Sequence, residues 1–410
     1  MSDSLEVWLD VDFLDEMIKV GTLAHDKGQV RFMYNKEWLE HPLRFTLSPH
    51  LTLDLAPFFP NPTTGNFGIF LDSSPDRWGQ TLMQRREVIE ARDESRKPRT
   101  LYAWDYLIGV QDQTRQGALR FKREGKTPFL ADTPISAPPV TRLGELEAVA
   151  KELTSKKIDD LDALKQWLTV LVAPGSSLGG ARPKANFTES DGSFWIAKFP
   201  AKDDVRDIGA WEMLVHKLAV EAGIDMPPAR MLQFQNDYHT FCVKRFDRHN
   251  GRRIFYASAM TMLKREDSEG ASYLDLAQFI MMNGAKNAIK QDLEQLFRRV
   301  IFNIAVGNRD DHLRNHGFLL TKNGWRLSPA FDVNPNLDKA SHVLNIDDQD
   351  NRPLLENALE TAELYELKPL RAQEITREVI NVVSSWEKIA KQLHIANIDI
   401  QAMGAVFLEA

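Results

Sequence analysis

Residues 307–316 read Gly307-Asn308-Arg309-Asp310-Asp311-His312-Leu313-Arg314-Asn315-His316, and the elements around them outline the C-terminal half. Before this loop, residues 292–306 repeat apolar side chains at the spacing of one helix face. After it, the apolar segment 317–320 predicts a strand. A polar loop between two rigid elements is a typical place for catalytic side chains.

The spacing inside this loop indicates phosphoryl transfer. Asp310 and Asn315 have four residues between them, like the catalytic Asp and the Mg²⁺-binding Asn of protein kinases. Asp332 follows a second expected strand, residues 325–327, where kinases carry a metal-binding Asp, although the Asp-Phe-Gly tripeptide is absent. Such oxygen ligands suit the hard cation Mg²⁺. Taken singly, the same residues also fit a solvated turn that caps its neighbours.

Two upstream features fit the phosphate side of a nucleotide site. Residues 174–184 form a Gly-rich loop that matches neither the Walker motif nor the kinase glycine pattern, and alone it also fits a flexible turn. Lys198 lies on the second strand of an expected hairpin whose turn is Asp191-Gly192. Alone, Lys198 also fits an ordinary lysine of an edge strand.

Glu212 lies on an expected helix, residues 207–222, where it could pair with Lys198 or simply occupy a solvated face. A strand at residues 241–243 follows. The order of Gly-rich loop, strand Lys, helix Glu, strand, Asp-x₄-Asn and Asp is the kinase order. That order favours the functional interpretation more than any single feature does.

Composition sets the broad class. The 410 residues suggest two or three domains, and 43% hydrophobic with 27% charged residues is ordinary for a globular protein. The net charge of −7 argues against coating nucleic acid by charge alone. The single Cys242, expected in a buried strand, cannot form an internal disulfide or a Cys-rich metal site and fits a reducing compartment. We find no signal sequence or apolar run of membrane-spanning length, so we expect a cytoplasmic protein with no membrane partner.

The pattern along the chain predicts an α+β fold. Short alternating strands and two helices, at 76–91 and 101–108, precede a Pro-rich segment, and helices are expected at 142–155 and 159–172. Beyond the polar loop and its strands the chain is expected to be helical to about residue 394. We predict an N-terminal α/β domain (1–127), a connector (128–140) and a mainly helical, kinase-like C-terminal domain (141–410).

At these positions the chain resembles the HipA family, serine/threonine kinase toxins of toxin–antitoxin modules, over nearly its full length. The N-terminal motifs are Asp72-Ser73-Ser74-Pro75-Asp76-Arg77 and Gln116-Gly117-Ala118-Leu119. The C-terminal motifs are residues 177–184, Ile196-Ala197-Lys198-Phe199-Pro200, Val243-Lys244-Arg245-Phe246-Asp247-Arg248, Asn308 to Asn315, and Phe331-Asp332.

The resemblance implies a role for each matching residue, with ATP and Mg²⁺ as cofactors. Asp310 is the implied catalytic base, and Asn315 and Asp332 are the implied metal ligands. Ser177 is the implied autophosphorylation site, with the adjacent Ser176 as the alternative. A phosphate on Ser177 would add negative charge beside the ATP phosphates and is expected to silence the kinase. The implied ATP-binding residues are Ser177, Leu178, Gly179, Gly180, Ala181, Lys184, Lys198, Glu212, Val243, Lys244, Phe246, Asp247 and His312.

The resemblance also implies partners. A small helix-turn-helix antitoxin, HipB-like, is expected to bind operator DNA as a dimer and to carry the kinase chains, so that DNA contacts are mainly indirect. The expected outcomes are autorepression and growth arrest or persistence. The substrate is expected to be a protein, which in the best-known relatives is an aminoacyl-tRNA synthetase.

Two rival functions stay open from the sequence. One is a metal-dependent phosphoesterase that uses Asp310, Asp311, His312 and Asp332. The other is a catalytically degenerate kinase fold that serves only as a corepressor scaffold. His312 and His316 lie four residues apart, but the absence of a His-Glu pair favours a structural role for them over zinc binding.

Overall fold

We analysed a computed structural model of the chain, which describes residues 3–130, 137–154, 182–235 and 237–408. Contacts divide the chain into two compact units. Unit 1 comprises Met1–Asp203 and Asp247–Ala257, and unit 2 comprises Asp204–Phe246 and Ser258–Ala410. The predicted domain boundaries around residues 128–140 differ from the division into these two units, and the predicted domains stay a prediction. No helix of the described residues is long and apolar enough to cross a bilayer.

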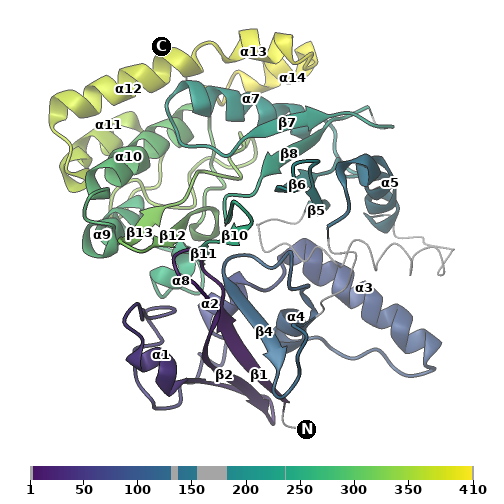
Figure 1. Cartoon of the computed structure of the whole chain (residues 1–410). Helices are drawn as coiled ribbons and strands as arrows, with labels where there is room; N and C mark the ends of the chain where they lie inside the picture. The colour runs from purple at the N-terminus through teal and green to yellow at the C-terminus, as the bar shows by residue number, and fades with distance from the viewer. Residues whose placement is uncertain (1–2, 131–136, 155–181, 236, 409–410) are drawn as a thin grey trace. The chain divides into compact units, whose positions relative to one another are not determined.

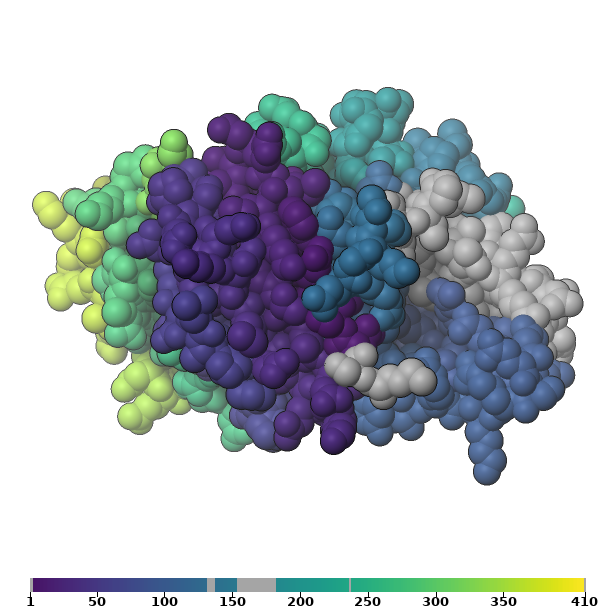
Figure 2. Space-filling view, turned by 60° about the horizontal axis from the view of Figure 1, so that its bottom comes forward, coloured from purple at the N-terminus to yellow at the C-terminus, as the bar shows by residue number. Residues whose placement is uncertain are grey.

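Unit 1 is built on an antiparallel sheet with strand order β3-β2-β1-β4. Every second side chain of β1 is buried, as expected when one face of a sheet covers a core. Leu5, Val7 and Leu9 on that face are fully buried. The outer surface of this N-terminal part, in purple and blue, faces the viewer in Figure 2. The strands are β1 (Asp3–Leu9), β2 (Ile18–Asp26), β3 (Gln29–Tyr34) and β4 (Leu119–Arg123).

Helices and hairpins complete unit 1. Asp76 caps the long helix α3 by accepting a hydrogen bond from the Gly79 amide, which explains why that helix begins at Arg77. The remaining elements are α1 (Lys36–Glu40), α2 (Gly68–Asp72), α3 (Arg77–Asp93), α4 (Ala103–Gly109), η1 (Val140–Arg142), α5 (Leu143–Thr154), the paired strands β5 (Lys184–Thr188) and β6 (Phe194–Lys198), and the paired strands β9 (Arg248–His249) and β10 (Arg252–Arg253).

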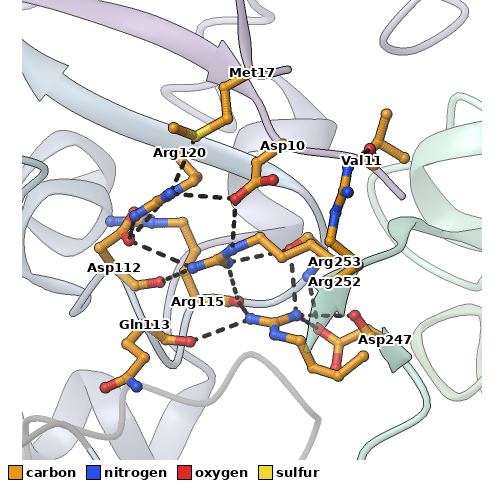
Figure 3. Close-up of polar contacts among 12 residues, drawn as sticks. Asp10, Val11, Met17, Asp112, Gln113, Arg115, Arg120, Asp247, Arg252 and Arg253 are labelled. Atoms are coloured by element: carbon orange, nitrogen blue, oxygen red, sulfur yellow. Dashed lines mark hydrogen bonds and ion pairs between the residues drawn. The ribbon is translucent and has the colours of Figure 1, made fainter. Parts of the chain in front are cut away.

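A cluster of charges ties the β9–β10 hairpin to the rest of unit 1 (Figure 3). We call it the arginine cluster: Asp112, Arg115 and Arg253, which are buried, and Asp10 and Arg120, which are half-buried. Arg120 donates to both carboxylate oxygens of Asp112 and, at 3.2 Å, to Asp10. Arg253 donates to the Asp112 carbonyl at 2.6 Å. Arg115 donates to three backbone carbonyls. Each buried charge therefore meets an opposite charge or a carbonyl dipole, as buried ions require.

Unit 2 is mainly helical. Helix α10 lies at its centre and packs against α9 and α12 (Figure 1). Its apolar stripe is buried from Leu293 to Ala305, as the periodicity predicted. The helices are α7 (Ile208–Glu221), α8 (Ala259–Met262), α9 (Tyr273–Asn283), α10 (Ile289–Ala305), η2 (Leu313–Asn315), α11 (Leu355–Glu360), η3 (Ala362–Tyr365), α12 (Pro369–Val383), α13 (Trp386–Gln392) and α14 (Asn397–Met403).

Two antiparallel pairs of strands belong to unit 2, namely β7 (Ala229–Leu232) with β8 (Thr240–Lys244), and β12 (Gly317–Thr321) with β13 (Gly324–Leu327). Strand β11 (Phe255–Ser258) spans the division between the units. Cys242 on β8 is fully buried, as predicted. The expectation of helix directly after the β13 strand was wrong, because residues 328–354 form no helix or strand. Pro329, Pro335 and Pro353 explain part of this, since proline lacks the amide hydrogen that a helix interior uses.

Candidate functional site

The polar loop begins where α10 ends, and a glycine makes the turn possible. Gly307 adopts a left-handed φ of 64°, and a Cβ added there would lie 1.9 Å from Val406 Cγ1. No larger residue fits without moving the C-terminal segment. The turn at Gly307 therefore fixes the direction in which the polar loop leaves the packed helix α10.

A buried carboxylate, Asp311, anchors the loop, and we call it and its three donors the Asp311 hub: Asp311, Tyr273, Asn303 and His316. The Tyr273 hydroxyl, Asn303 Nδ2 (2.8 Å) and His316 Nε2 (2.8 Å) all donate to Asp311 Oδ2. These donors come from α9, α10 and the residue before β12. The hub thus fixes the middle of the loop to three separate elements.

The contacts of the hub favour the ionised form of Asp311. Burial raises the pKa of the Asp311 carboxyl, but His316 beside it and the hydrogen bonds from His316 and Tyr273 outweigh burial, so its pKa lies below the usual value. Burial next to Asp311 raises the pKa of Tyr273 well above its usual value, which keeps the hydroxyl protonated as a donor. The solvated-turn interpretation is therefore wrong for Asp311, which is 3% exposed.

The neighbouring Asp310 points outward. Its side chain is exposed, Oδ1 contacts Lys339 Nζ, and Oδ2 takes no hydrogen bond from the described residues. Asn315 lies at the end of the short η2 turn, and its Nδ2 donates to the Asp310 carbonyl at 3.4 Å. The Asn315 amide group therefore contacts the backbone of Asp310, and the roles that the spacing predicts for the two residues stay predictions.

The Asn315 side chain also presents an unused acceptor. Its Oδ1 is buried and has no hydrogen-bond partner among the described residues. A buried amide oxygen without a donor is costly, so a native structure needs a reason for it. A hard cation is one such reason, because Mg²⁺ binds amide and carboxylate oxygens.

The segment after β13 carries two more candidate oxygen ligands, Asp332 and Asn334. Asp332 is half-buried and adopts a left-handed φ of 58°, a conformation that non-glycine residues enter at a cost and that occurs at functional sites. Asn334 Oδ1 is buried and, within the part of the chain that the structure describes, unpaired. Sequence reasoning did not assign Asn334, although its position two residues after Asp332 is a signal that could have found it.

Asn315 also borders a small cavity in unit 2. The cavity lies between the end of α7, α10, the polar loop and the segment before Asp332. Its lining residues are Ala219, Ile224, Met226, Arg299, Phe302, Asn303, Asp311, Asn315, His316, Ala330, Phe331 and Val333.

The remaining predicted ATP-binding residues of unit 2 lie on two elements. Glu212 is buried on α7, and Val243 and Lys244 are half-buried on β8. The Phe246 ring packs against Phe331, the residue before Asp332, with ring centres 5.5 Å apart. This contact brings the end of the predicted adenine segment next to the predicted metal-binding segment.

His312 is half-buried at the start of the η2 turn, and its Nδ1 has no hydrogen-bond partner among the described residues. Across the ranges described above, no three His, Cys, Asp or Glu side chains form a metal-binding group.

Three predicted ATP-binding residues lie in unit 1. Lys198 is 9% exposed on β6. Lys184 is buried and its Nζ lies 2.8 Å from Asp76 Oδ2, so this ammonium pairs with a protein carboxylate. Asp247 is also buried, and it accepts hydrogen bonds from the Gly117 amide (2.8 Å) and Arg248 (2.7 Å). The structure gives Lys184 and Asp247 structural partners that the sequence did not predict.

The helix expected at 159–172 lies outside the described residues, and so does most of the predicted phosphate loop, residues 174–181. This applies to Ser176, Ser177, Leu178, Gly179, Gly180 and Ala181.

Comparisons with known proteins agree with this arrangement. The sequence profile of the HipA-like C-terminal domain matches residues 176–386, and that of the HipA N-terminal domain matches residues 7–97. A provisionally named kinase of Haemophilus influenzae is 26% identical over 181 residues, 38% of this chain and about half (52%) of the relative. The serine/threonine-protein kinase toxin HipA of Shewanella oneidensis is 24% identical over 368 residues, which is 81% of this chain and 76% of the relative.

A solved HipA structure has the same fold. HipA in the complex of HipA, HipB and operator DNA from Shewanella oneidensis MR-1 superposes with a TM-score of 0.68 at 18% identity, covering 98% of this chain and 94% of that one. The α+β fold and the polar loop after α10 thus define a chain with the HipA architecture, as predicted. The chain belongs to the HipA family.

Proposed function

We propose that the protein is an ATP- and Mg²⁺-dependent serine/threonine protein kinase that acts as the toxin of a HipA/HipB-type module. The observation that carries this proposal is that one loop holds the exposed carboxylate of Asp310 and the buried Asn315 Oδ1, which has no hydrogen-bond partner among the described residues. The exposed Asp310 carboxylate suits a base that accepts a proton from a substrate hydroxyl approaching from solvent. The Asn315 Oδ1 suits a cation ligand. The names of the relatives support the same conclusion.

The proposed reaction transfers the γ-phosphoryl group of ATP to a protein hydroxyl. As the hydroxyl oxygen bonds to phosphorus and the bond to ADP breaks, Asp310 accepts the hydroxyl proton. Asn315 and Asp332 would hold Mg²⁺, which when bound neutralises phosphate charge and aligns it for transfer. The Asp311 hub keeps the loop rigid, so that Asp310 and Asn315 need little reorganisation at the moment of transfer.

The other roles follow the family pattern. Lys198 would contact the ATP phosphates with Glu212 orienting it, Val243, Lys244 and Phe246 would line the adenine, and Ser177 would carry the silencing phosphate. Lys184, Asp247 and His312 would also belong to the ATP-binding site. We also propose a HipB-like antitoxin dimer on operator DNA as partner, because the HipA with the matching fold forms such a complex.

The test is transfer of labelled γ-phosphate. The full chain is incubated with Mg²⁺, γ-labelled ATP and a bacterial lysate, and phosphosites are mapped on the chain and on lysate proteins. We expect Asp310→Asn to lower the rate by about 10²–10⁴-fold, the usual range for loss of a general base. Asp338→Asn, a matched exposed aspartate in the same region, should keep the wild-type rate.

Two outcomes would contradict the proposal. Wild-type protein that labels nothing while still repressing its operator with an antitoxin would favour the scaffold. Release of phosphate from simple esters without any requirement for adenine would favour the phosphoesterase.

A further inference from the structure

Lys339 contacts the side chain that the proposed function makes the catalytic base. It lies in the irregular segment after Asp332, and its Nζ contacts Asp310 Oδ1. Exposed ion pairs usually contribute little to stability, so the contact alone would mean little. The hydrogen bonds that hold the backbone of Lys339 make the contact between Lys339 and Asp310 more significant.

The backbone around Lys339 is held by three hydrogen bonds, two of which reach the polar loop at Gly307 and Arg309. The Asn336 amide donates to the Gly307 carbonyl at 2.9 Å. Asn336 Oδ1 accepts the Lys339 amide at 3.0 Å, and Arg309 Nη1 donates to the Lys339 carbonyl at 2.6 Å. The lysine therefore rises from a turn that is attached to the same loop that carries Asp310.

Lys339 contacts only one carboxylate oxygen of Asp310, Oδ1. Oδ2 takes no hydrogen bond from the described residues, so it stays open to a hydroxyl donor while Oδ1 holds the ammonium. If a substrate hydroxyl donates to Oδ2, the phosphorus atom that its oxygen attacks would lie within a few ångströms of the Lys339 ammonium. Lysine has a flexible stem and three donors, so a small torsion change brings Nζ onto the phosphoryl oxygens.

We propose that Lys339 is a further catalytic residue, which orients Asp310 through Oδ1 and donates to the equatorial oxygens of the phosphoryl group during transfer. The inference rests on the proposed function. In the step, the acceptor oxygen bonds to phosphorus, the bond to the ADP oxygen breaks, and the hydroxyl proton passes to Asp310 Oδ2. Lys339 keeps its three protons and neutralises negative charge on the phosphoryl group during its transfer.

The first test separates kcat from KM with Mg²⁺·ATP and a phosphorylatable protein. Lys339→Met should lower kcat at least about tenfold with little change in the KM for ATP, because the contact strengthens only in the transition state. Lys339→Arg should restore most of the rate, since it retains the positive charge. Lys322→Met, an exposed lysine in the β12–β13 turn, is the matched control and should match wild type.

The second test measures binding without turnover. Lys339→Met should weaken the affinity for ADP with Mg²⁺ and aluminium fluoride, a mimic of the transferring group, while leaving the affinity for ADP with Mg²⁺ unchanged. An inactive wild type would remove the proposed function itself. An active wild type with a Lys339→Met variant of equal or higher rate would overturn only this inference, and a higher rate would make the ion pair inhibitory.

Discussion

Each unit buries a cluster of charges, and the two clusters differ in whether they are closed. In unit 1 the arginine cluster pairs its charges with carboxylates and backbone carbonyls (Figure 3). In unit 2 the Asp311 hub is equally buried, but it adjoins an exposed Asp310 and the unpaired Oδ1 of Asn315. Buried charge by itself therefore does not mark a site. A rigid cluster next to open acceptors does.

Among the changes that test this comparison of the two clusters, the largest expected effect is on catalysis, from Asp311→Asn. The change removes the charge that Tyr273 and His316 face, and a loop shift of about 1 Å can cost about 10²-fold in rate. We expect kcat to fall by about that factor, together with a loss of several kcal/mol in the free energy of unfolding. Steady-state kinetics and urea denaturation check both, with Asp338→Asn as the control. A variant that is destabilised but fully active when folded would show that the hub does not serve the site.

Next comes stability, from Arg253→Met in the arginine cluster. The change leaves Asp112 and Asp10 with one fewer cation, and breaking a buried pair typically costs about 3–5 kcal/mol. Chemical denaturation should show this loss, while Arg31→Met, an exposed arginine of β3, should change little. If Arg253→Met kept wild-type stability, the view of this cluster as a structural one would be wrong.

The third effect depends on pH. Burial lowers the pKa of His342 from its ordinary 6.5 to about 4, so the folded state holds this ring neutral. Between those values the unfolded chain binds more protons, and stability must fall as pH falls from about 6.5 to about 4. His342→Gln should remove part of that slope, on the order of 2–3 kcal/mol across the window. Thermal unfolding from pH 4 to 7, with exposed His249→Gln as control, measures it; an unchanged slope would count against a buried neutral ring.

The smallest effect is expected at an exposed pair in α1. Lys36 Nζ and Glu40 lie 3.6 Å apart on the surface. Lys36→Ala should change the free energy of unfolding by less than about 0.5 kcal/mol. Chemical denaturation would reveal a larger loss, which would mean that exposed and buried charge differ less here than we argue.

The local elements of the site could be predicted because they depend on near neighbours. The stripe of α10 and the turn at Gly307 follow from periodicity and from glycine. That Asp310 and Asn315 share one short loop follows from their spacing, while their roles stay predictions. The β5–β6 hairpin follows from the Asp191-Gly192 turn.

The tertiary contacts could not be predicted in this way. Tyr273 and Asn303 reach Asp311 from helices whose relative position no local pattern encodes. Lys339 lies in a segment without periodicity, which sequence reasoning expected to be helical. Lys184 was expected at the nucleotide, and its partner Asp76 lies 108 residues away in the chain.

The most direct measurement of the central claim is metal binding by the open acceptor of unit 2. Mn²⁺ replaces Mg²⁺, and its free concentration is followed by electron paramagnetic resonance in the presence of a non-hydrolysable ATP analogue. We predict tight Mn²⁺ binding by the wild type and by Asn323→Ala, an exposed asparagine, and at least about tenfold weaker binding by Asn315→Ala. Equal Mn²⁺ affinity in Asn315→Ala and the wild type would contradict the account.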